Sequence, residues 1–349
     1  MKLALKRALK LLHLAVATLL LVVPAQAATE IMWWHAMSGE LGKQLEKLAA
    51  DFNASQSDYR IVPAYKGNYT ETVTAAIFAF RSRSQPAIVQ VNEIATATMM
   101  AARGAIYPVF ELMRDQSEVF APQAYLPAVA GYYADVDGNM LSFPFNASTP
   151  ILYYNKDLFQ KKGVEVPKTL DEMAVAAEKL TDPKEGVYGF VGRGLRNANM
   201  AMWSNFYLNY GGEFLDAKGN ILSDGPEAIE ATKLYQRLLT KCAPPGVAGF
   251  NWMESMASFT QGRAAMWIDA TVAASFVTNP AQSTVAGKVG FALAPNTGLG
   301  KNANWLWAWS LAIPAGSKKV DAAEKFIAWA TSKDYSKLVA SKEGWSNVP

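Results

Sequence analysis

The chain has 349 residues and a net charge of +3 at pH 7, with one cysteine, two histidines and 10 tryptophans. Four cations lie within the first ten residues, so the remainder carries a net charge of −1 and gives no electrostatic reason to expect nucleic acid as a partner. The single Cys242 excludes an internal disulfide, and one histidine beyond the leader, His35, is too few for a zinc site. We therefore expect no metal and no cofactor.

The first 27 residues have the pattern of a secretory signal peptide. Four cations, Lys2, Lys6, Arg7 and Lys10, precede an apolar run at 11–23, and Ala-Gln-Ala at 25–27 supplies a cleavage pattern. The apolar run is too short and wrongly flanked for a transmembrane helix. The leader predicts export to the periplasm.

The chain after the leader alternates between strand and helix patterns. The expected elements are a strand at 31–34, a helix from 38 to 52, a strand at 59–65, a helix from 69 to 80 and a strand at 86–91. This βαβαβ rhythm predicts an α/β fold with a mostly parallel sheet and helices on both faces.

Four side chains fall at the carboxyl ends of these strands, where ligands of such sheets collect: Trp34, His35, Tyr69 and Glu93. Each also has a structural interpretation. His35 could be a capping histidine, Tyr69 a turn tyrosine and Glu93 a charge at a helix N-terminus. Their common placement favours a binding role.

The stretch at 144–157 joins a polar turn containing Ser148 to an apolar strand and a helix start. A strand with small polar groups at its mouth suits a ligand site, although an ordinary buried strand has the same pattern. The second half is expected to contain helices at 170–180, 202–207, 227–239, 255–263 and 322–330, and strands at 187–191, 264–268 and 305–313.

Aromatic residues hold the apolar faces of a sugar or polyol, while carboxylates bind its hydroxyls. Trp203, Asp269, Trp307 and Trp345 suit that role, although most tryptophans are expected in the core. A secreted glycosidase using Glu93 and Asp269 is an alternative, but nothing in the sequence sets the distance between these two carboxylates.

The acidic run at 135–139 resembles a calcium-binding loop in composition. It lacks the terminal glutamate of such a loop, so it predicts a hairpin turn instead.

Several motifs resemble known proteins. WHAMSGELG at 34–42, YKGNY at 65–69, ATATMM at 95–100 and PFNASTPILYYNKD at 144–157 resemble the periplasmic glycerol-3-phosphate-binding proteins of bacterial ABC importers, over about 28–165. GFVGRGLRNAN at 189–199, PPGVAGFN at 244–251 and GRAAMW at 262–267 resemble sugar- and polyol-binding proteins of the same extracellular solute-binding superfamily.

The resemblance implies a type II two-lobe binding protein. It predicts an N-terminal lobe at 28–150 and a C-terminal lobe at 151–349, with a hinge crossover near 151–155 and a return crossover near 307–313. The implied role is capture of sn-glycerol-3-phosphate or a glycerophosphodiester for an importer with two permease subunits and an ATP-binding subunit dimer. It implies a monomer without catalytic activity.

The resemblance also bears on single residues. Tyr69, Glu93 and Ser148 match ligand contacts of the glycerol-3-phosphate proteins, Trp203 matches their tryptophan, and Trp345 stands where they have a tyrosine. Their phosphate-binding arginine lies in a C-terminal segment that this chain lacks, so the chain is expected to be truncated. Asp269 would repel a phosphate, which counts in favour of a neutral sugar or polyol, unless Arg193 or Arg196 supplies the missing cation. The specificity of the motifs in the first half keeps glycerol-3-phosphate, or a diester of it, as the first expectation and a sugar or polyol as the second.

Overall fold

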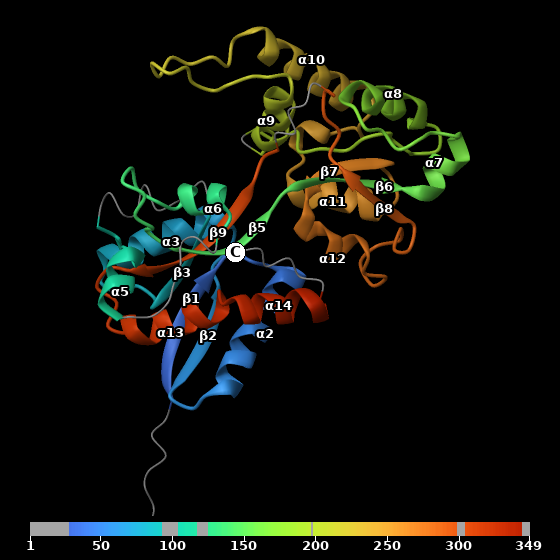
Figure 1. Cartoon of the computed structure of the whole chain (residues 1–349). Helices are drawn as coiled ribbons and strands as arrows, with labels where there is room; N and C mark the ends of the chain where they lie inside the picture. Colours follow the sequence, from blue (N-terminus) through green and yellow to red (C-terminus); the bar gives the residue numbers. More distant parts are fainter. Residues whose placement is uncertain (1–27, 93–103, 117–124, 197, 299–303, 344–349) are drawn as a thin grey trace, which may run out of the picture.

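The structure is a computed structural model that describes residues 28–92, 104–116, 125–196, 198–298 and 304–343. Glu93, Trp345, the leader and the ATATMM motif lie outside the described residues. Figure 1 shows two bodies of helices and strands, joined by β5 with β6 and by the segment that enters β9. We call them the first lobe, which contains the N-terminal strands, and the second lobe.

The first lobe is built on a mixed sheet in the order β2-β1-β3-β9-β4, with β5 also paired to β9. Its described strands are β1 (Thr29–His35), β2 (Tyr59–Tyr65), β3 (Ile88–Asn92), β4 (Ile106–Tyr107), β5 (Phe143–Ser148) and β9 (Trp307–Pro314). Strands β1, β2 and β3 are parallel, whereas β9 runs antiparallel to β3, β4 and β5.

Helices cover both faces of this sheet, as the alternating pattern predicted. α2 (Gly39–Ser55) and α13 (Val320–Ala330) pack on one face, where Phe326 contacts Trp33 at a ring distance of 5.3 Å. α3 (Tyr69–Arg81) packs on the other face through Ala76. The remaining described helices of this lobe are α5 (Val109–Gln116), α6 (Pro127–Tyr132) and α14 (Lys333–Glu343).

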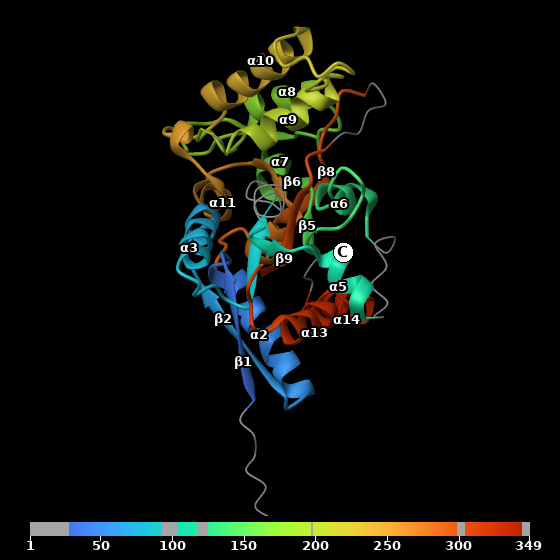
Figure 2. The same cartoon turned by 90° about the vertical axis from the view of Figure 1, so that its left-hand side faces the viewer.

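The second lobe has a three-stranded antiparallel sheet in the order β7-β6-β8. These strands are β6 (Pro150–Asn155), β7 (Met266–Ala270) and β8 (Val289–Leu293). Its described helices are α7 (Lys156–Lys162), α8 (Leu170–Leu180), α9 (Met200–Asn209), α10 (Pro226–Lys241), α11 (Trp252–Thr260) and α12 (Ala274–Val277), with short 3-10 turns at Val247–Gly249 and Thr271–Ala273. Figure 2 shows α8, α9 and α10 together at the far end from β1 and β2.

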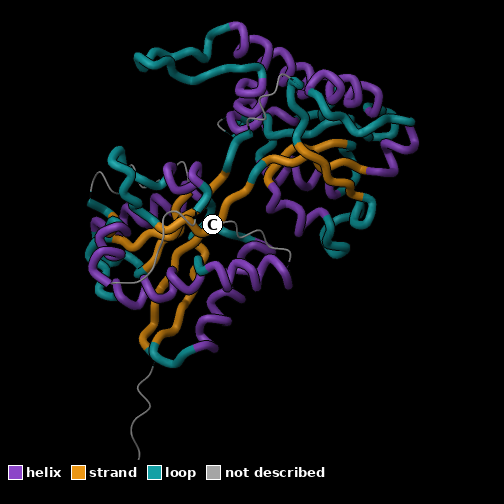
Figure 3. The backbone as a smooth tube through the Cα atoms, viewed as in Figure 1, coloured by secondary structure: helices purple, strands orange, loops and turns teal. Residues whose placement is uncertain are grey.

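The chain passes between the lobes twice in the tube drawing (Figure 3). β5 ends at Ser148 in the first sheet and β6 begins at Pro150 in the second. The return passage enters β9, which completes the first sheet. α13 and α14 then follow, and α13 packs on α2.

Two expectations need correction. The sheets are not mostly parallel, because β9 arrives from late in the chain and the second lobe pairs its strands antiparallel. The segment 187–191 forms only isolated bridges, to Asp182, Ala264 and Trp267. α13 follows β9 and buries its apolar face against α2 and β1. The domain boundaries themselves stay a prediction.

Candidate functional site

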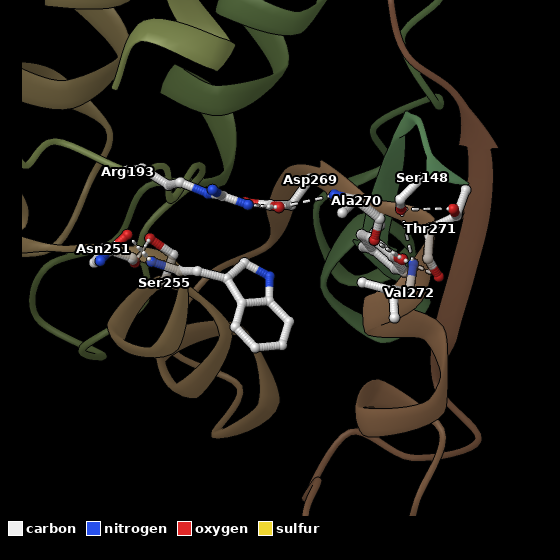
Figure 4. A network of polar contacts seen from close by, with 10 residues as sticks. Ser148, Arg193, Asn251, Ser255, Asp269, Ala270, Thr271 and Val272 are labelled. Atoms are coloured by element: carbon white, nitrogen blue, oxygen red, sulfur yellow. Dashed lines mark hydrogen bonds and ion pairs between the residues drawn. The ribbon is translucent and has the colours of Figure 1, made fainter. Parts of the chain in front are cut away.

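A buried ion pair lies at the end of β7, in the second lobe. The Asp269 carboxylate accepts from Arg193 Nε at 2.9 Å and from Arg193 Nη2, a two-pronged contact visible in Figure 4. The backbone N–H of Ala270 donates to Asp269 Oδ1 at 2.8 Å. The Asp269 side chain is 0% exposed and that of Arg193 13%, so solvent screens this pair little.

The pair balances its own charge. Burial by itself would lower the pKa of Arg193, but the adjacent Asp269 carboxylate acts in the opposite direction; the pKa is raised overall, and the guanidinium is charged. Asp269 is therefore not the free anion that the sequence suggested, and Arg193 is not a free cation. The two together present donors and acceptors with no net charge.

The ion pair is in contact with the return crossover. The guanidinium carbon of Arg193 lies 5.0 Å from the centre of the Trp307 ring, within the range of a cation–π contact. Trp307 begins β9 and pairs with Ser148 of β5. An aromatic side chain of the first sheet and an ion pair of the second lobe therefore meet where the lobes join.

Ser148 continues this polar network across the crossover. Its hydroxyl lies 2.8 Å from Thr271 Oγ1 and accepts from the N–H of Val272 at 3.2 Å (Figure 4). The Tyr153 hydroxyl donates to the Ala270 carbonyl at 2.7 Å.

The lobes are also in contact away from this network. Gln282 Nε2, in the second lobe, donates a hydrogen bond of 2.8 Å to Glu40 Oε1, in the first lobe.

A second cluster lies at the strand ends of the first lobe. Trp309 Nε1 donates to the Tyr69 hydroxyl at 2.6 Å, and the Tyr69 hydroxyl contacts Met37 Sδ at 3.7 Å. The N–H of Met37 donates to His35 Nδ1 at 3.3 Å.

Two expected contacts lie elsewhere. Trp34 points to the face of the sheet covered by α3, and Lys66 Nζ lies 4.4 Å from its ring centre. Trp203 stacks on Tyr207 at 4.8 Å and donates to Thr232 Oγ1 at 2.9 Å. It lines a cavity of about 460 Å³ between α9 and α10.

The structure thus brings Ser148, Arg193, Asp269 and Trp307 into one network, with Tyr69 and His35 in the adjoining cluster. The residues that we did not single out are Met37, Thr271 and Trp309. Trp309 could have been found, because it stands two residues after Trp307 and a strand places such residues on the same face. The others depend on contacts between distant parts of the chain.

The acidic hairpin turn at 135–139 is confirmed. Residues Ala134 and Met140 pair across it, and the Asp135 carboxylate accepts from the N–H groups of Asp137 and Asn139. The side-chain amide of Asn139, which donates to Asp135 Oδ2 at 3.0 Å, lowers the pKa of Asp135 most, and the backbone N–H groups lower it further. Within the described ranges, no group of three or more His, Cys, Asp or Glu side chains is arranged to hold a metal ion. Nor does any described helix combine the length and apolar character needed to cross a membrane.

His35 should make the folding stability depend on pH. Its side chain is 4% exposed, and burial lowers its pKa to about 4. The unfolded chain takes up this proton below pH 6.5, whereas the folded chain does so only near pH 4. The free energy of unfolding should therefore fall by roughly 3 kcal/mol as the pH drops from 6.5 to 4, because 2.5 pKa units correspond to that energy.

Urea denaturation at several pH values between 7 and 4 measures this effect. His35→Asn retains an acceptor for the Met37 N–H but cannot titrate, so its stability should fall less over the same interval. Equal pH dependence in the two proteins would contradict the assignment.

The fold and the site define a class: a two-lobe α/β binding protein whose polar and aromatic groups meet at the crossover between lobes. The chain belongs to the bacterial extracellular solute-binding protein family, whose model matches residues 38–337. The family consists of solute-binding transport proteins rather than enzymes.

Curated relatives match half of the chain. The sn-glycerol-3-phosphate-binding periplasmic protein of Rhizobium meliloti is 48% identical over 187 residues, which is 52% of this chain and 44% of that protein. The protein of the same name from Yersinia enterocolitica is 52% identical over 167 residues, covering 47% of this chain and 38% of that one. The chain thus spans less than half the length of these relatives.

Solved structures match nearly the whole of this chain. An ABC transporter solute-binding protein from Agrobacterium vitis S4 with bound D-mannitol is 38% identical with a TM-score of 0.77, covering 92% of this chain and 77% of that one. One from Agrobacterium radiobacter K84 in complex with ribitol is 29% identical with a TM-score of 0.76, covering 90% and 79%.

Proposed function

We propose that this chain is the solute-binding component of an ABC importer and that it captures a small neutral polyol between its lobes. The observation that carries the choice of ligand is the Arg193–Asp269 pair. Within this charge-balanced pair the Arg193 side chain keeps 13% exposure, so its guanidinium can donate to the hydroxyl groups of a neutral ligand. Trp307 offers an apolar face beside it. The likeness to the mannitol-bound and ribitol-bound proteins supports this proposal.

Glycerol-3-phosphate, or a diester of it, is the second candidate. It is favoured by the identity of 48% to the glycerol-3-phosphate-binding protein of Rhizobium meliloti. Tyr69 and Ser148 belong to motifs that resemble those proteins. Against it stands the engagement of Arg193 with Asp269, which leaves this cation no excess charge for a phosphate.

The proposed function also includes the location of the protein, its transporter partners and its remaining candidate ligand contacts. The leader would direct the chain to the periplasm, and the ligand-bound form would dock as a monomer on two permease subunits driven by an ATP-binding dimer. Glu93 and Trp345 stay candidate ligand contacts. We propose no bond chemistry, because the Asp269 carboxylate is committed to Arg193 and Ala270 rather than free to act as acid or nucleophile.

A thermal-shift series tests the ligand. D-mannitol, ribitol, maltose, glycerol-3-phosphate and glycerophosphocholine are added to the purified chain, and D-mannitol or ribitol should raise the melting temperature by several degrees at saturation. Asp269→Asn should weaken polyol binding at least about tenfold, because it disrupts the charged bidentate contact that holds the Arg193 guanidinium in place. Asp182→Asn, which removes an exposed carboxylate paired with Lys162, serves as the matched control and should bind as the unmodified chain does.

Other outcomes of the thermal-shift series would change or contradict the proposed ligand. A shift with the two phosphates alone would replace the polyol with the second candidate. Stronger phosphate binding in Asp269→Asn would show that Arg193 can serve a phosphate once its partner is neutral. The absence of a shift with every compound, from a protein that melts cooperatively, would contradict a binding role at this site.

A further inference from the structure

Arg193 stands in a tightly packed segment outside regular secondary structure. A Cβ added at Gly194 would lie 2.2 Å from the Val247 carbonyl oxygen, so only glycine fits there. Hydrogen bonds from the N–H of Val191 to the Met266 carbonyl and from the N–H of Leu195 to the Phe250 carbonyl hold the two ends of the segment. Between these ends, the Arg193 carbonyl accepts from the Tyr235 hydroxyl at 2.8 Å.

Tyr235 is well suited to hold this carbonyl. It lies on α10, is 5% exposed, and packs its ring edge against Phe206 at 5.6 Å. Burial raises the pKa of Tyr235, with Arg193 acting in the opposite direction, so the hydroxyl keeps its proton at neutral pH and can donate. The bond joins helix α10 to the segment that carries the ion pair.

The Tyr235 ring packs in the core on one side and borders a cavity on the other. This is the cavity of about 460 Å³ that Trp203, Thr232 and Leu239 also border. On the cavity side the ring has fewer packing partners, so the hydrogen bond to Arg193 adds a restraint to those of its core neighbours.

We propose that Tyr235 is a positioning residue for the ligand site. Its hydroxyl holds the Arg193 backbone so that the guanidinium can meet both Asp269 oxygens while it lies over Trp307. Arg193 can make the bidentate contact with Asp269 and the cation–π contact with Trp307 at the same time only if its side chain is displaced very little. The effect on affinity rests on the proposed function, whereas the effect on Arg193 itself does not.

Tyr235→Phe removes the hydroxyl and keeps the ring. Thr232→Val is the matched control, because Thr232 is on the same helix, lines the same cavity, and bonds Trp203 and the Ala228 carbonyl instead of Arg193. The first readout is the exchange rate of the Arg193 Nε–H with solvent in the ligand-free protein, measured by NMR with the signal assigned through Arg193→Lys. We expect it to be about tenfold faster in Tyr235→Phe and unchanged in Thr232→Val.

The second readout is the affinity for D-mannitol by calorimetry, expected to be about three- to tenfold weaker in Tyr235→Phe. Unchanged exchange in Tyr235→Phe, or an equal change in Thr232→Val, would overturn the positioning role. If the unmodified chain does not bind D-mannitol, the polyol proposal fails, and the exchange rates still decide the role of Tyr235. Faster exchange with unchanged D-mannitol affinity would overturn its importance for binding.

Discussion

Arg193→Met should lower the free energy of unfolding by about 3–5 kcal/mol, because it leaves the fully buried Asp269 carboxylate without its partner. Methionine fills much of the arginine volume, so the lost charge rather than a cavity dominates the effect. Urea denaturation at pH 7 measures it.

The double variant Arg193→Met/Asp269→Leu is the control. It removes both charges, and apolar replacements of a buried pair are often neutral or stabilising. Most of the lost stability should therefore return. A double variant as unstable as Arg193→Met would mean that packing, and not the unpaired charge, causes the loss. Neither variant should bind a polyol as the unmodified chain does.

Phe326→Ala should cost about 3–5 kcal/mol, since it deletes a fully buried ring from the core of the first lobe. The ring lies 5.3 Å from Trp33 and 5.2 Å from Phe52, which come from β1 and α2. The prediction tests whether the helix after the return crossover belongs to this core. Urea denaturation again gives the measurement.

Lys325→Ala on the same helix is the comparison. Its ammonium lies 5.6 Å from the Tyr59 ring centre at the surface, so its loss should cost no more than about 1 kcal/mol. Similar small effects for both variants would contradict the packing of α13 on the first sheet.

Local patterns in the sequence predicted much of the secondary structure. The helix expected at 170–180 has those bounds in α8, where Thr169 and Glu172 form a reciprocal capping box. The strand expected at 59–65 is β2. Such elements depend on neighbours three or four residues apart, or on alternation, and both are visible in one stretch of sequence.

The site was predicted in part. Tyr69, Ser148, Asp269 and Trp307 stand at strand ends or at the crossover, where the α/β pattern places ligand contacts. Trp203 does not join them, because its place on α9 turns it towards Thr232 and Tyr207. Helical periodicity alone does not tell which neighbour a side chain will meet.

The sequence by itself therefore predicted a leader, and it determined the α/β rhythm and the types of side chain at the strand ends. Only the tertiary structure decided that β9 enters the first sheet, that Arg193 neutralises Asp269 76 residues away, and that Tyr235 holds the Arg193 carbonyl. The physical reason is that these contacts join segments far apart in the chain. Their energies depend on burial and geometry, which no local pattern of residues contains.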